Sequence, residues 1–251
     1  FIYHRYLNVY SFIFNINQLF VQMQNTVIIV AGGSGNRMDS TLPKQFMELD
    51  DKPILMHTMN RFYTFDNNMH IVLVLPHKQV SFWKSLCEKH KFDLQHEIVD
   101  GGETRFHSVR NGLVTIEESS VIGIHDGVRP CVSVDTIKNC YQTAHSNGNA
   151  IPVVPVNESV RLKENCTNRS FDRTKLWLVQ TPQVFQSELI RKGFEQAYHE
   201  SFTDDANVVE SAGYKIYMVD GNRENIKITT RSDLLIAEAF IKNECKKAKA
   251  L

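Results

Sequence analysis

The sequence predicts an α/β domain in which helices cover both faces of a mostly parallel central sheet. From Met23 onward, apolar runs typical of buried strands alternate with stretches of helical periodicity, which is the pattern of such folds. The length of 251 residues fits one domain of this kind or at most two small ones. Hydrophobic and charged contents of 42% and 22% are ordinary for a globular protein.

The strands are predicted from continuous apolar runs, because central parallel strands are buried on both faces. The clearest runs are residues 27–30, 71–75 and 121–124. Shorter or more polar strands are predicted at residues 97–99, 150–156, 214–219 and 225–228. Ligands of such sheets gather beyond the carboxyl ends of the strands, so the residues that follow these runs are candidates for a site.

Helices are predicted between these strands from apolar spacing and from residues that favour a helix start. Pro53 suits the first turn of a helix that runs to about Phe65, and Ser133 is placed to cap another. Two further helices are predicted around residues 83–86 and 109–116. Three more are predicted at about residues 187–198, 204–212 and 232–245.

The pattern changes between residues 157 and 173. Residues 157–163 alternate between polar and apolar side chains, and residues 165–170 are rich in turn formers. This predicts a two-stranded hairpin arm. The arm has few large apolar residues to bury on its own chain, so we expect it to need a partner surface.

Charge and cysteine content exclude some classes of protein. Lys+Arg and Asp+Glu both number 28, so nucleic acid is not an expected partner, since phosphate binding favours a basic excess. The five cysteines form no C-x-x-C pair or zinc spacing, which favours reduced thiols and a cytoplasmic location. No apolar run approaches the roughly 18 residues of a spanning helix, so no membrane partner is expected. Residues 1–22 are interpreted as an N-terminal extension outside the functional domain.

A glycine-rich segment, AGGSGNRM at residues 31–38, follows the first strand directly and is the strongest candidate for a functional site. Its backbone N–H groups can reach phosphate oxygens, and Arg37 and Lys44 add positive charge. The segment lacks the third glycine of the dinucleotide-binding pattern G-x-G-x-x-G, and Lys44 lacks the neighbours of a Walker lysine. A triphosphate grip fits these residues, and a solvated surface loop with two exposed cations is the alternative.

Several short motifs accompany this loop in a fixed order. They are LPKQF at residues 42–46, DGGETRFHSV at 100–109, HDGVRP at 125–130, LW at 176–177, QTPQ at 180–183, TDDA at 203–206 and ENIKIT at 224–229. Together with the loop, the set resembles the 2-C-methyl-D-erythritol 4-phosphate cytidylyltransferase family over about residues 26–241. The resemblance implies a cytidylyltransferase domain at residues 23–245, with the hairpin arm at about 157–173, and a C-terminal tail at 246–251.

The resemblance also implies a fold and a reaction. The fold is a Rossmann-like nucleotidyltransferase sandwich with a mostly parallel central sheet and a protruding β-hairpin dimerisation arm. In the reaction, CTP and 2-C-methyl-D-erythritol 4-phosphate give the CDP-linked alcohol and pyrophosphate, a step of the non-mevalonate isoprenoid pathway. Mg²⁺, or another divalent cation, would be held mainly by the CTP phosphates, with Asp126 as an indirect ligand.

Residue roles carry over with the motifs. Catalytic roles in stabilising or clamping phosphate charge are implied for Arg37, Lys44, Arg173 and Lys227. Nucleotide binding is implied for Ala31, Gly32, Gly33, Gly35, Gly102, Ser108, Asp126 and Gly127. Substrate binding is implied for Arg129, Ser159, Thr181 and Thr203. Arg173 and Ser159 lie on or beside the arm and would complete the substrate site of the second subunit in a homodimer.

Three other functions stay open at this point. A relative that cytidylates ribitol 5-phosphate shares the loop and the dimer, although QTPQ and TDDA look more like the isoprenoid branch. An NAD(P)-dependent oxidoreductase is the rival of another class, and the missing third glycine argues against it. A nucleotide-sensing module without catalysis is the last alternative, and pyrophosphate release by a Lys44→Ala variant would distinguish it.

Overall fold

The computed structural model describes residues 23–32, 42–117 and 120–249. The predicted N-terminal extension therefore lies outside the described residues. At the centre is an eight-stranded sheet with the order β10-β7-β11-β6-β1-β4-β5, and β12 pairs with β7 off this path. The strands are β1 (Gln24–Val30), β4 (His70–Leu75), β5 (Glu97–Asp100), β6 (Ser120–Asp126), β7 (Asn149–Pro155), β10 (Trp177–Val179), β11 (Gln183–Gln186) and β12 (Met218–Asp220).

The sheet is mostly parallel, as predicted. β1 runs parallel to β4 and to β6, and β4 runs parallel to β5. β11 is antiparallel and lies between β6 and β7. The register places Val30 beside both Val74 and Asp126, and Leu75 beside Asp100, so the carboxyl ends of four strands are level at one edge.

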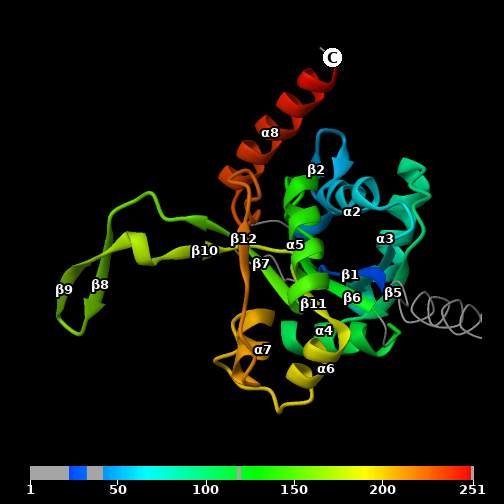
Figure 1. The fold of residues 1–251 in the computed structure, drawn as a ribbon. Helices are drawn as coiled ribbons and strands as arrows, with labels where there is room; N and C mark the ends of the chain where they lie inside the picture. Colours follow the sequence, from blue (N-terminus) through cyan, green and yellow to red (C-terminus); the bar gives the residue numbers. More distant parts are fainter. Residues whose placement is uncertain (1–22, 33–41, 118–119, 250–251) are drawn as a thin grey trace, which may run out of the picture.

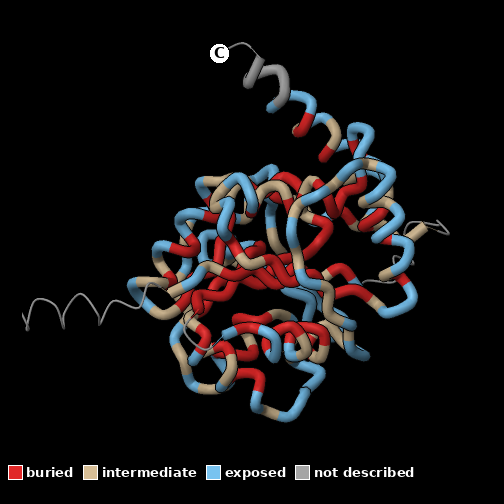
Figure 2. Tube along the Cα trace, turned by 90° about the vertical axis from the view of Figure 1, so that its right-hand side faces the viewer, coloured by how far each residue is buried: buried red, intermediate tan, exposed pale blue. Residues whose placement is uncertain are grey.

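Helices cover both faces of this sheet (Figures 1 and 2). One layer contains α2 (Ile54–Phe65), α3 (His77–His90) and α5 (Val134–Asn147), whose large buried side chains include Phe62, Trp83 and Tyr141. The other layer contains α4 (Arg105–Val114), α6 (Ser187–Phe194) and α7 (Asp205–Ser211), with Phe106 and Phe194 stacked between them. Figure 2 shows the buried strands between these layers, which is the reason for their continuous apolar runs.

Local residues account for where the helices begin and end. Thr104, Ser133 and Asp204 cap α4, α5 and α7, because each side chain accepts a hydrogen bond from a backbone N–H of the first turn. α5 ends at Gly148, whose φ of 94° is open to glycine and costly for other residues. The predicted cap at Ser133 is thus confirmed.

Three sequence predictions differ from the structure. The strand predicted at 225–228 is wrong. The Ile228 N–H donates to the Val128 carbonyl, but the segment joins no sheet. The side chain of buried Asn225 instead donates to the Thr181 carbonyl in the loop before β11. The strand predicted at 214–219 is confined to β12. The helix predicted to residue 198 ends four residues earlier, at Phe194.

The last helix, α8 (Arg231–Lys249), extends into the segment predicted as a tail. It packs Ala237 and Ile241 against Leu49 and Ile54, near the short strands β2 (Glu48–Leu49) and β3 (Lys52–Pro53). None of the helices in the described parts of the chain is long and apolar enough to cross a membrane. The cysteines described as free thiols are Cys87, Cys131, Cys140 and Cys166, and the cytoplasmic location stays a prediction.

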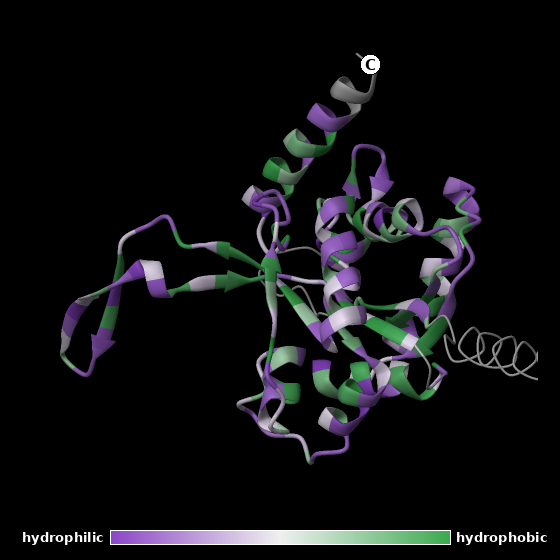
Figure 3. Cartoon of the chain, viewed as in Figure 1, coloured by the Kyte–Doolittle hydropathy of each residue, from purple (hydrophilic) through white to green (hydrophobic). Residues whose placement is uncertain are grey.

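A hairpin leaves the body between β7 and β10 (Figure 1). Its strands, β8 (Val160–Glu164) and β9 (Thr167–Phe171), pair antiparallel over five residues each. Residues 161–170 are all exposed, and Figure 3 shows this outer part to be mostly hydrophilic. We call residues 157–173 the arm. Its role in dimerisation stays a prediction.

Candidate active site

The level ends of β1, β4, β5 and β6 border a cavity of about 260 Å³. It lies where a mostly parallel sheet is expected to bind ligands. The predicted site residues that line it are Ala31, Gly32, Lys44, Gly102, Ser108, Asp126 and Lys227. Segments from five parts of the sequence therefore meet as the motifs predicted. Gly33, Gly35 and Arg37 lie outside the described residues.

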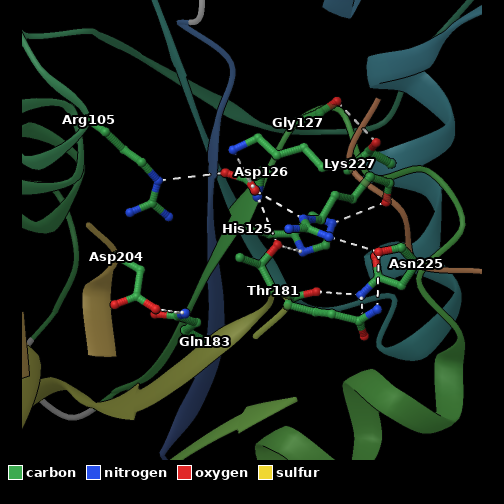
Figure 4. A network of polar contacts seen from close by, with 12 residues as sticks. Arg105, His125, Asp126, Gly127, Thr181, Gln183, Asp204, Asn225 and Lys227 are labelled. Atoms are coloured by element: carbon green, nitrogen blue, oxygen red, sulfur yellow. Dashed lines mark hydrogen bonds and ion pairs between the residues drawn. The ribbon is translucent and has the colours of Figure 1, made fainter. Parts of the chain in front are cut away.

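Asp126, at the end of β6, is the centre of a cationic cluster (Figure 4). Its Oδ2 lies 3.0 Å from Arg129 Nε and 3.1 Å from Lys227 Nζ, and its Oδ1 lies 3.6 Å from Arg105 Nε. Burial by itself raises the pKa of this carboxyl, but Arg105, Lys227 and Arg129 outweigh it and hold the pKa well below its usual range. Asp126 is therefore ionised at neutral pH and fixes three cations beside the cavity.

A buried layer behind Asp126 holds this carboxylate in place. The Asp126 backbone N–H donates to Thr181 Oγ1 at 3.2 Å. His125 Nε2 faces the Arg129 carbonyl at 3.3 Å, and because a carbonyl only accepts, the ring proton is assigned to Nε2. Nδ1 then accepts from the Thr181 hydroxyl at 2.9 Å. Burial lowers the pKa of His125 to about 3, so the imidazole is neutral. His125 is therefore an orienting residue that acts on Asp126 through the Thr181 hydroxyl.

Two predicted substrate-binding residues belong to this support layer. Arg129 Nη1 donates to the Asn225 carbonyl at 2.8 Å, and the Asn225 side chain donates to the Thr181 carbonyl at 2.8 Å. The segment around Asn225 thereby holds both Arg129 and Thr181. Neither of the two is among the residues that line the cavity. Their contact with a substrate stays a prediction.

The wall opposite Asp126 is formed by the turn that leads into α4. The Gly102 N–H donates to Ser108 Oγ at 3.1 Å, and the Ser108 hydroxyl donates to the Thr104 carbonyl at 2.9 Å. A Cβ at Gly102 would lie 2.4 Å from His107 Cβ, so only glycine fits here. The Ser108 hydroxyl thus fixes the bare backbone of Gly102 at the wall of the cavity.

Ala31, directly after β1, is held by a glutamine to which the sequence assigned no role. Buried Gln45 donates through Nε2 to the Ala31 carbonyl at 2.6 Å and to Gln79 Oε1 at 2.7 Å. It belongs to the short 3₁₀ helix η2 (Lys44–Phe46), so the same turn carries Lys44 to the cavity. Gln45 therefore sets the distance between Ala31 and Lys44.

Gly127 and Thr203 occupy positions away from the cavity lining. The Gly127 N–H donates to the Val30 carbonyl at 2.9 Å, and its carbonyl accepts from Thr58 at 3.1 Å. A Cβ at Gly127 would lie 2.9 Å from that of Ala31, so this glycine permits close packing of two loops. Thr203 is exposed just before the cap of α7. Their predicted ligand contacts are untested by the geometry.

The arm does not bring its predicted residues to the cavity of its own chain. Ser159 and Arg173 are exposed, and neither lines the cavity. Arg173 begins the 3₁₀ helix η3 (Arg173–Lys175), and its guanidinium donates to the Asn157 carbonyl at the base of the arm. Within one chain, the cavity and the arm are separate regions.

Sequence analysis missed the ion pair between Arg105 and Asp205. Both guanidinium Nη atoms lie 2.7 Å from the Asp205 carboxylate oxygens, and Arg105 lines the cavity. The two residues are 100 positions apart, Arg105 in the motif DGGETRFHSV and Asp205 in the motif TDDA. A basic residue in the first motif and an acidic one in the second were the only features of the sequence that indicated a pairing.

Cations grouped with fixed glycine backbone at the carboxyl edge of a parallel sheet define a nucleotide-binding α/β protein of the nucleotidyltransferase class. Residues 25–243 match the sequence profile of 2-C-methyl-D-erythritol 4-phosphate cytidylyltransferase. The chain belongs to the 2-C-methyl-D-erythritol 4-phosphate cytidylyltransferase family. This confirms the resemblance found in the motifs.

Individual relatives agree in sequence and in fold. The chain is 51% identical over 219 residues to the 2-C-methyl-D-erythritol 4-phosphate cytidylyltransferase of Phocaeicola vulgatus, covering 87% of this chain and all of the relative. The Bacteroides fragilis enzyme of that name is also 51% identical, with the same coverage. The crystal structure of 4-diphosphocytidyl-2C-methyl-D-erythritol synthase from Anaerococcus prevotii superposes with a TM-score of 0.75 at 26% identity, covering 88% of this chain and 99% of that one.

Proposed function

We propose that this protein transfers the cytidylyl group of CTP to 2-C-methyl-D-erythritol 4-phosphate, giving 4-diphosphocytidyl-2-C-methyl-D-erythritol and pyrophosphate in the non-mevalonate pathway. Family membership supports this activity. The observation that carries it is the cluster around Asp126, where Arg105, Arg129 and Lys227 converge beside a glycine backbone. Such a cluster suits two phosphorylated substrates whose charges must be brought together.

The reaction needs no covalent intermediate with the protein. A phosphate oxygen of the alcohol phosphate attacks the α-phosphorus of CTP, and a new P–O bond forms. The bond from the α-phosphorus to the oxygen bridging to the β-phosphorus breaks, and its electron pair leaves with pyrophosphate. The protein holds the reactants in line and stabilises charge that builds up on the phosphate oxygens. Lys44 and Lys227, with Arg37 from the glycine-rich loop, are proposed for that role.

The nucleotide would be recognised by backbone groups around the cavity. Ala31, Gly32 and Gly102 present main chain to the cavity, and Ser108 keeps the Gly102 turn in place. Gly33, Gly35 and Gly127 are proposed to complete this surface. Carbonyl groups suit the cytosine amino group, which needs an acceptor.

The alcohol phosphate is proposed to bind on the side of Lys227. This ammonium is 41% exposed while it contacts Asp126, so it can share its charge with an arriving phosphate. Arg129 is 13% exposed and held by Asp126 and Asn225. Thr181 and Thr203 are proposed as hydroxyl contacts for this substrate.

Mg²⁺, or another divalent cation, is proposed as the cofactor. Among the described residues, no group of three or more His, Cys, Asp or Glu side chains could hold a metal ion. A cation carried mainly on the triphosphate fits these residues, with Asp126 as an indirect ligand. When bound, the ion would neutralise triphosphate charge.

We further propose a homodimer in which the arm of one chain completes the substrate site of the other. Trp177, Leu178 and Met218 at the base of the arm are between 43% and 58% exposed, as is Val179, and Figure 3 shows β10 as hydrophobic. Exposed large apolar side chains close together are typical of contacts between proteins. Ser159 and Arg173 would then reach the partner's cavity, with Arg173 clamping a phosphate.

An assay of purified protein tests the substrate. We expect pyrophosphate release from CTP with 2-C-methyl-D-erythritol 4-phosphate, and much slower release with ribitol 5-phosphate. Faster turnover of the ribitol compound would overturn the assignment. The Lys44→Ala variant should lose about 100- to 1000-fold in kcat, the usual cost of one transition-state contact. An unchanged rate would show that Lys44 does not take part in the chemistry as proposed, and absence of pyrophosphate release from the wild-type chain itself would favour a nucleotide sensor.

Mixed dimers test the action of Arg173 across subunits. Lys44→Ala and Arg173→Ala chains are co-expressed with different tags, and the mixed dimer is compared with both parents. One of its two sites combines an intact cavity with an intact arm, so the isolated mixed dimer should recover about half of the wild-type activity, and an unsorted random mixture about a quarter. If Arg173 acts on its own chain, neither site is intact and no activity returns.

A further inference from the structure

The structure holds an ion pair that ties the wall of the cavity to a neighbouring helix. Arg105 is the first residue of α4 and Asp205 is the first residue of α7. Each Nη of Arg105 lies 2.7 Å from one carboxylate oxygen of Asp205, so the pair is bidentate. A planar guanidinium held at two points has a fixed plane as well as a fixed position.

Because Asp205 occupies both Nη atoms, the remaining Nε edge of Arg105 is turned toward the cavity. Nε lies 3.6 Å from Asp126 Oδ1, on the side opposite the contacts that Arg129 and Lys227 make with Oδ2. Arg105 thereby prevents Asp126 from being drawn wholly toward those two cations. The orientation of Asp126 follows from where Arg105 is held.

Asp205 is itself fixed by the central sheet. Gln183 of β11 donates through Nε2 to Asp204 at 2.8 Å, and its Oε1 accepts the Ala206 N–H at 2.7 Å (Figure 4 shows the first contact). Both neighbours of Asp205 are therefore bound to one side chain of the sheet. Gln183 therefore fixes the position of Asp205 relative to β11.

The ion pair lies between the interior of the protein and the cavity. Asp205 is 1% exposed, whereas the Arg105 side chain is 29% exposed where it borders the cavity. Burial of Arg105 disfavours its charged form, but Asp205 outweighs this effect and raises the pKa of the guanidinium above its ordinary value. Removing the Asp205 charge leaves Arg105 free to turn toward Asp126 or toward solvent.

We propose that Asp205 is a positioning residue for the reaction, which holds Arg105 against Asp126 and so sets the nucleotide side of the cavity. The inference rests on the proposed function. It predicts that loss of the Asp205 charge weakens CTP binding and turnover, beyond any effect on folding. The alcohol phosphate, proposed to bind on the Lys227 side, should be affected much less.

The test uses the isosteric variant Asp205→Asn in the full chain. We expect CTP affinity, measured by calorimetry without the alcohol phosphate, and kcat each to fall about 10-fold or more, as for other supporting contacts. The KM for the alcohol phosphate should change less than about 3-fold. Asp205→Glu, which keeps the charge, should bind CTP better than Asp205→Asn even if it unfolds at a lower temperature.

Arg105→Lys covers the case in which Asp205→Asn fails to fold, because an ammonium cannot form the bidentate pair. It should reproduce the CTP defect, and the double variant should add little to either single change, since the two residues act as one unit. Tyr141→Phe is the matched control: it removes a buried 2.6 Å hydrogen bond to the Thr26 carbonyl in the other helix layer. It should lower stability and leave both substrate constants unchanged.

Two outcomes overturn the inference. One is a variant at Asp205 that melts earlier but keeps CTP affinity and kcat, which makes the pair purely structural. The other is an equal loss of affinity for both substrates. If the wild-type chain binds CTP but does not turn over 2-C-methyl-D-erythritol 4-phosphate, the proposed function fails. The comparison of CTP affinities between the variants still tests the role of Asp205.

Discussion

The cavity edge and the arm differ in how their polar side chains are held. Asp126 is 9% exposed and contacts residues from α4, from the loop after β6 and from the segment before α8. Arm residues 161–170 are all exposed, and the arm's ordered contacts lie mainly within the hairpin and at its base. One chain therefore preorganises the polar groups of the cavity, whereas the arm contributes nothing to the cavity lining of its own chain.

Among substitutions that distinguish the cavity edge from the arm, the largest effect on kcat is expected at Lys227. The Lys227→Ala variant should lose about 100- to 1000-fold in kcat, because it removes a preorganised charge beside the reacting phosphates. Its melting temperature should change little, since this half-exposed ammonium contributes less to folding than Arg105 or Arg129 does. Steady-state kinetics and calorimetry measure both quantities.

Lys89→Ala is the control for that experiment, because Lys89 forms an exposed ion pair with Glu48 at 3.3 Å outside the cavity lining. Its kcat should match that of the wild-type chain. A Lys227→Ala variant with near-normal kcat would show that the cluster around Asp126 does not carry the chemistry.

A smaller effect is expected from the buried layer under Asp126. Burial lowers the pKa of His125 from 6.5 to about 3. Below pH 6.5, this histidine therefore binds a proton in the unfolded chain but stays neutral in the folded chain. The free energy of unfolding should therefore decrease as the pH falls from 6.5 to 3. By pH 5 this one residue accounts for about 2 kcal/mol, at roughly 1.4 kcal/mol per pH unit.

His125→Gln removes this titration while keeping a polar side chain at the position. Denaturant unfolding at pH 7 and pH 5 should show a smaller loss for the variant than for the wild-type chain. An identical loss in both would mean that other groups cause the acid sensitivity.

The smallest effect is expected in the arm. Arg169 pairs with Glu164 at 2.8 Å, but both side chains are about half exposed. Arg169→Gln should shift the melting temperature by less than about 2 °C, because exposed ion pairs contribute little. A shift of many degrees would show that this ion pair contributes far more than its exposure in one chain implies, as it would if a second surface buried it.

Much of the fold could be predicted because its signals are local. Buried strands such as residues 71–75 are continuous apolar runs, and Ser133 marks a helix start through its own side chain. The segment at 225–228 looked like a strand by the same rule. It is held instead by Asn225, Arg129 and Val128, partners that no pattern of neighbouring residues specifies.

The site could be predicted in part for the same reason. Ala31 and Gly32 lie directly after β1, Gly102 follows β5 closely, and Asp126 ends β6, so the sheet brings them together. The positions of Arg105 with Asp205, and of Gln45 with Ala31, depend on tertiary contacts across 100 and 14 residues. The motifs contain these residues, but their sequence does not indicate which of them form contacts with each other.

The way the arm joins the body has an evolutionary consequence. Its two ends leave from adjacent points, because Pro155 of β7 stands opposite Trp177 of β10 in register. A segment whose ends already meet can change length or sequence at small cost in loop closure, without rebuilding the sheet beneath it. The arm can therefore diverge in length and sequence among homologous chains while the cavity at the strand ends stays intact.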